Sequence, residues 1–156
     1  MYIRVLLFLH VLSAIAGFGP TFVFAITGGL MRQVGPNGGP VLLDVNKGIE
    51  RKLLKPASYV VQPLTGFLLI GALGIHRNWG DNMWLVISLV LYAIALTISL
   101  TITSPALKKM IRITKGEEGA PADLPALGKK SAMFGGIQHL LLISIIFLMV
   151  VKPGRG

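Results

Sequence analysis

The feature that most constrains this chain is an uncharged stretch of twenty-seven residues, Val5 to Met31, bounded by Arg4 and Arg32. About twenty apolar residues, each adding 1.5 Å of helix rise, cross a bilayer core of roughly 30 Å. The stretch is therefore long enough to span a membrane as a tilted helix. The composition agrees, because 53% of the residues are hydrophobic. Only 13% are charged, against about a quarter in soluble domains.

Three further apolar stretches follow, and together the four predict an all-α, integral membrane four-helix bundle that forms one transmembrane domain. Between the first two stretches, apolar residues recur near the helical period among charged ones, which predicts an amphipathic helix on the membrane surface at about 41–55. The Gly- and Pro-rich segment 35–40 before it predicts a loop. The four spans are expected at about 5–31, 56–75, 83–107 and 131–151.

The basic residues are unevenly distributed along the chain. Eleven of the fifteen Lys and Arg lie in the segments 32–55 and 108–130. The positive-inside rule then places both segments in the cytoplasm, and both termini and the 76–82 turn outside. Topology thus explains the net charge of +9, and we expect the lipid bilayer as partner and no nucleic acid. The chain has no cysteine, which excludes disulfides, thiolate metal sites and covalent haem attachment.

Small residues four positions apart allow helices to approach closely in a membrane. Ser13 and Gly17 form such a pair in the first span. The third span carries two such stripes, which predicts that it packs on two neighbouring helices. These stripes are Ala93–Thr97–Thr101 and Ala95–Ser99–Thr103.

Three histidines, His10, His76 and His139, are the candidate site residues. No Asp or Glu falls inside the predicted spans, so a carboxylate relay or a transporter is not expected. Neutral imidazole is a common axial ligand of haem b in a helical bundle. His139 is expected level with Val23, roughly 20 Å from His10 along the axis, whereas two axial ligands of one iron lie only about 4 Å apart. A haem held by His10 with His76, or by one histidine alone, remains possible.

Each histidine also has a structural interpretation. His10 would bond to a backbone carbonyl of the neighbouring hairpin, and His139 to the side chain of Gln62 or Tyr92. His76, in a polar turn, would be solvated.

Several short motifs carry a resemblance to known families. The chain has Leu9-His10 followed by small residues and Gly17-Phe18-Gly19, then Pro63-Leu64-Thr65-Gly66, and finally Met149-Val150-Val151-Lys152-Pro153. In these it resembles an uncharacterised bacterial family of four-span membrane proteins. Its first span also distantly resembles the membrane protoporphyrinogen oxidase and copper-resistance D families. That resemblance implies His10 as a haem iron ligand. The chain differs from the oxidases in having Phe18 for the usual tryptophan and no lysine within a span.

Two functions follow as expectations. The first is an accessory subunit of a larger membrane complex, or a homo-oligomer, in the bacterial cytoplasmic (inner) membrane. The alternative is a small b-type haem or porphyrin protein in electron transfer or porphyrin oxidation, with His10 as ligand.

Overall fold

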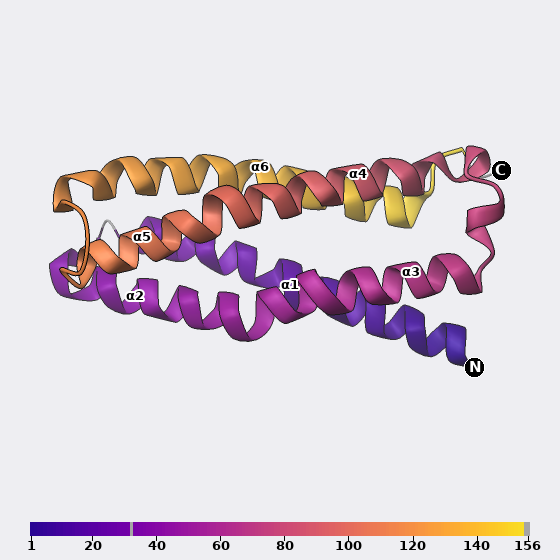
Figure 1. Cartoon of the computed structure of the whole chain (residues 1–156), viewed down its shortest axis with the longest axis horizontal. Coiled ribbons are helices and arrows are strands. Elements are labelled where there is room, and N and C mark those ends of the chain that lie inside the picture. Colours follow the sequence, from indigo (N-terminus) through magenta and orange to yellow (C-terminus); the bar gives the residue numbers. More distant parts are fainter. Residues whose placement is uncertain (32, 155–156) are drawn as a thin grey trace.

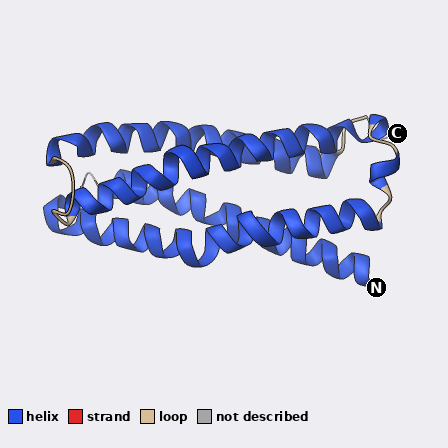
Figure 2. Cartoon of the chain, in the orientation of Figure 1, coloured by secondary structure: helices blue, strands red, loops and turns tan. Residues whose placement is uncertain are grey.

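Four long helical rods form an elongated antiparallel bundle in the computed structural model, which describes residues 1–31 and 33–154 (Figure 1). Every regular element among these residues is helical (Figure 2). The predicted all-α bundle is therefore confirmed.

The rods contain several elements in chain order. Helix one is α1 (Tyr2–Leu30). Helix two joins α2 (Gly35–Ile49), the π-helical turns η1 (Glu50–Leu54) and η2 (Pro56–Val61), and α3 (Gln62–Ala72). The short 3₁₀ turns η3 (Ile75–Arg77) and η4 (Gly80–Asn82) lead to helix three. Helix three joins α4 (Met83–Ile98), the π-helical η5 (Ser99–Thr103) and α5 (Ser104–Thr114). Helix four is η6 (Pro121–Asp123) followed by α6 (Leu124–Val151).

Four helical stretches are long and apolar enough to cross a membrane, as predicted, and all four are longer than the expected spans. They are Tyr2–Leu30, Gly38–Ala72, Gly80–Thr114 and Pro121–Val151.

The helix predicted at about 41–55 is present, but it is not a separate element, because this segment runs without a break into the helix of the second span. Its place on the membrane surface stays a prediction. Leu43 and Asn46 are buried in it, so the segment packs within the bundle. The loop predicted at 35–40 is helical too, since α2 begins at Gly35. Proline is tolerated in the first turn of a helix, where its missing N–H has no partner in any case.

Proline residues explain where helices two and three change from α-helical to π-helical turns. Inside an α-helix a proline removes the bond to residue i−4 and its ring clashes with that carbonyl. The chain accommodates Pro56 at the start of η2, and Pro63 and Pro105 as the second residues of α3 and α5, each next to a π-helical turn. A π-helical turn bonds i to i+5, so the backbone keeps its hydrogen bonds without a break in the rod.

The connections divide between the two ends of the bundle. The start of α1, the turn between α3 and α4, and the end of α6 lie at one end (Figure 1). The segments that join α1 to α2 and α5 to α6 lie at the other end, which we call the basic end, because the Lys- and Arg-rich segments meet there. The side of the membrane to which each end belongs stays a prediction.

The apolar core is divided into three small clusters along the bundle axis. One cluster joins α2 to α5 near the basic end, a second joins α1 to α6, and a third joins α3 to α4 at the opposite end. Polar residues of helix two occupy the levels between them. The buried members are Leu43, Leu107, Met110 and Ile111; Phe18, Leu142 and Ile145; and Ile70, Trp84 and Leu85.

The close helix approach predicted at Ser13 and Gly17 is confirmed. Both residues are buried, Ser13 against Gln62 of α3 and Gly17 against Ser58 of η2. A Cβ at Gly17 would overlap the Ser58 hydroxyl, whereas a Cβ at Gly19 would meet nothing within 4 Å.

We therefore expect Gly17→Leu to separate helices one and two and to lower the free energy of unfolding by about 1–3 kcal/mol, the usual cost of overpacking. Gly19→Leu is the matched control on the same helix, with a side chain that points away from the bundle. Unfolding in mixed detergent micelles measures both variants. Equal stability of the two variants would contradict the close packing of these helices.

Candidate functional site

Helix two carries a line of buried polar side chains through the bundle, which we call the polar seam: Asn46, Glu50, Ser58, Gln62 and Thr65. Their spacing of three, four or eight residues keeps them on one face of the rod. That face is turned toward helices one and three.

His10 of α1 is the centre of the best-connected part of the seam. Gln62 Nε2 donates to His10 Nε2 at 3.1 Å, and His10 Nδ1 lies 2.9 Å from Thr65 Oγ1. The Ser13 hydroxyl donates to Gln62 Oε1 at 2.5 Å, and the Thr65 hydroxyl donates to the Val61 carbonyl at 2.7 Å. A neutral imidazole with its proton on Nδ1 satisfies the whole set. The predicted backbone partner for His10 is therefore wrong, because its partners are side chains of α3.

This geometry bears on the haem prediction. Both ring nitrogens of His10 are already engaged, and the ring is pressed against Gly66, where an added Cβ would lie 3.2 Å from His10 Cε1. An axial iron ligand needs one ring nitrogen free. As packed, His10 does not fit that role without losing Gln62 or Thr65. Haem ligation by His10, His76 or His139 stays a prediction.

Glu50 is a buried carboxylate that the sequence analysis placed outside the membrane spans. It lies in η1 with its side chain 7% exposed, 3.0 Å from Lys55 Nζ, and accepts a hydrogen bond from Ser104 of α5. The expectation of spans free of carboxylates stays a prediction, although Glu50 lies in the same long helix, Gly38–Ala72, as the second span. The repeat Asn46, Glu50, Ser58, Gln62 on both sides of Pro56 was the sequence signal for one continuous helix.

The remaining seam contacts join helix two to both neighbours. Asn46 Nδ2 donates to the Thr27 hydroxyl of α1 at 2.9 Å. The Tyr59 and Ser99 hydroxyls lie 2.6 Å apart, and the Tyr92 hydroxyl donates to the Ser58 carbonyl. In hydrocarbon, such bonds replace water that the groups have lost.

The other predicted residues lie apart from the seam. His139 packs its ring against Phe22, with 4.8 Å between the ring centroids, which confirms the expected level near Val23. Its predicted hydrogen bond to Gln62 or Tyr92 is wrong. Among the described residues its buried Nε2 has no hydrogen-bond partner, while the neighbouring Gln138 donates to the Ala95 carbonyl at 3.1 Å. His76 is exposed in the η3 turn, as expected.

Comparison with known proteins agrees with this architecture. Residues 4–153 match a family model described as "Predicted integral membrane protein (DUF2269)". The chain belongs to this family. No curated protein and no solved structure matches it. Membership confirms the predicted uncharacterised family of integral membrane proteins, and the match covers all four helical rods.

Removing the negative charge of Glu50 tests whether the polar seam stabilises the bundle. Glu50→Gln keeps an acceptor for Ser104 but leaves Lys55 without its counterion, and we expect a loss of about 2 kcal/mol in the free energy of unfolding. The expected loss in the free energy of unfolding is smaller than for a fully buried pair, because the Lys55 side chain is 31% exposed. Asp44→Asn removes the exposed pair with Lys115 and serves as the control, since exposed pairs contribute about 0–1 kcal/mol. Equal effects in a micelle unfolding titration would contradict a buried structural role for Glu50.

Proposed function

We propose that this protein is an accessory subunit that associates with a larger complex inside the membrane. The proposal rests on one observation: of the two small-residue stripes of helix three, one is buried and the other is exposed. Ala95 and Ser99 are buried against other helices of the chain. Ala93, Thr97 and Thr101 are exposed on the outside of the bundle.

The exposed stripe has the shape of a helix-docking face. Val90, Ile94 and Leu100 flank it and are 54%, 44% and 55% exposed, so large apolar side chains alternate with small ones. The Thr97 and Thr101 hydroxyls donate to the carbonyls of Ala93 and Thr97 at 2.9 and 2.7 Å. Because these hydroxyls are satisfied locally, the face is compatible with hydrocarbon and offers a groove for a partner helix.

The interior supports a non-catalytic role. Four of the five seam side chains, those of Asn46, Glu50, Gln62 and Thr65, are bonded to side chains of helices one and three, which favours a packed core over a substrate site. Two shallow pockets lie at the basic end, and the residues that line them are not part of the seam.

To test the proposal, the tagged protein is purified from its native membrane in mild detergent, and the mass of its complex is measured. We expect wild type to run with partner subunits of different sequence, and the double variant Ala93→Leu/Thr97→Leu, with its groove filled, to run as the 16.7 kDa chain alone. Ile94→Leu, which adds no volume on the same face, should behave as wild type. A complex built only of this chain, or one unaffected by the double variant, would overturn the proposal.

The absorption spectrum of the same preparation distinguishes the accessory subunit from the alternative, a small haem protein. The accessory-subunit proposal predicts no Soret band from this chain. A near-stoichiometric haem that His10→Ala removes would favour electron transfer or porphyrin oxidation instead.

We further propose that the membrane is a bacterial cytoplasmic one and that the basic end faces the cytoplasm. The unequal distribution of Lys and Arg supports this orientation. A reporter that is active only outside the cytoplasm, fused after residue 156, is expected to be active. Activity of a cytoplasmic reporter at that position would reverse the orientation.

A further inference from the structure

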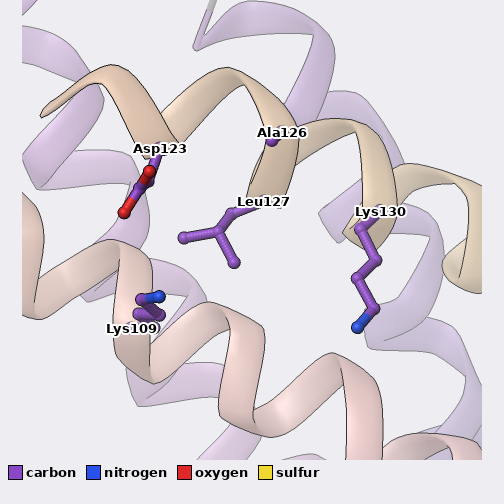
Figure 3. Close-up of a pocket in the computed structure, with 5 residues that line it drawn as sticks. All are labelled: Lys109, Asp123, Ala126, Leu127 and Lys130. Carbon is purple, nitrogen blue, oxygen red and sulfur yellow. The ribbon is translucent and has the colours of Figure 1, made fainter. Parts of the chain in front are cut away.

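A cleft opens at the basic end between α5 and the first turns of helix four (Figure 3). Its volume is about 250 Å³. Lys109 lines it from α5, and Lys130 lines it from α6, with Leu127 between them; Asp123 lies at the same end as Lys109 (Figure 3). Ala126 completes the lining. Two cations from different helices therefore flank one apolar side chain in a concave surface.

The charge in this cleft is not neutralised within the described part of the chain. The salt bridges found there join Lys55 to Glu50, Arg112 to Glu118 and Lys115 to Asp44. None of them involves Lys109 or Lys130, and Asp123 forms no ion pair with either lysine. The neighbouring Lys108 and Lys129 add further positive charge. Two lysines against the Asp123 carboxylate leave the cleft with a net positive charge, which attracts an anion.

The cleft also lies at a defined depth. Lys109 comes two residues after Leu107, the last residue of the uncharged stretch 83–107. Lys130 comes one residue before the uncharged stretch 131–151. Both lysines therefore stand where two neighbouring helices leave the hydrocarbon, which is the level of lipid phosphates.

We propose that this cleft binds the headgroup of an anionic phospholipid that carries free hydroxyl groups. Lys109 and Lys130 hold the phosphate, and Leu127 contacts the upper part of the lipid beneath it. The Asp123 carboxylate accepts a hydrogen bond from a headgroup hydroxyl, which sets the preference among anionic lipids. Basic pockets between membrane helices are suited to such headgroups. The site is independent of the partner proposed for α4.

The experiment counts lipids bound to the purified full-length chain by mass spectrometry of the intact complex. The protein is first reconstituted with an equal mixture of phosphatidylglycerol and phosphatidylcholine. We expect wild type to retain one phosphatidylglycerol with at least a tenfold preference, and Lys109→Gln/Lys130→Gln to lose that preference. The matched control is Lys108→Gln/Lys129→Gln, which removes the same charge from adjacent positions outside this cleft and should change the preference less than threefold.

Asp123→Ala tests the headgroup assignment. Phosphatidic acid has a phosphate but no headgroup hydroxyl, so the variant should lose the discrimination between phosphatidylglycerol and phosphatidic acid while it still binds both. If both lysine double variants lost the preference for phosphatidylglycerol over phosphatidylcholine to the same extent, diffuse surface charge would explain the binding and the proposal would be overturned. Release of the lipid by millimolar inorganic phosphate would overturn it in favour of a free-phosphate site.

Discussion

The structure depends on one constraint: a polar side chain inside hydrocarbon must find its hydrogen-bond partner within the protein. Helix two brings five such side chains into the bundle, and helices one and three supply hydrogen-bond partners for four of them. Ser13 and His10 of α1 meet Gln62, and Ser104 of α5 meets Glu50. Apolar side chains pack equally well against lipid, so these polar contacts, together with close packing at Gly17, specify which helices are neighbours.

The same constraint separates the interior from the outside of the bundle. Inside, both ring nitrogens of His10 are bonded to side chains of the seam, which leaves His10 little freedom for other chemistry. Outside, helix three presents a small-residue face that the described part of the chain does not cover, and the basic end presents a charged cleft. Both proposed interactions with other molecules therefore use the surface: a partner helix on α4 and an anionic lipid between α5 and α6.

The sequence was sufficient for the helical class, for four spans and for the Ser13–Gly17 approach, because hydrophobic length and small-residue spacing are local signals. It was insufficient around Pro56, where the amphipathic segment 41–55 was expected as a separate helix although it is continuous with the helix that follows. The buried contacts of Glu50 were missed for that reason, since the carboxylate was assigned to a helix on the membrane surface. The partners of His10 and His139 could not be predicted either, because they depend on the rotation of each rod, which small apolar motifs do not determine.

The most direct test of the polar seam is a double-mutant cycle between His10 and Gln62, with each residue replaced by leucine singly and together. Unfolding of the four proteins in mixed micelles gives the coupling free energy. A hydrogen bond between membrane helices predicts a favourable coupling of roughly 0.6–1.7 kcal/mol. Additive effects, with no coupling within error, would contradict the account, because helices one and two would then be held together by packing alone.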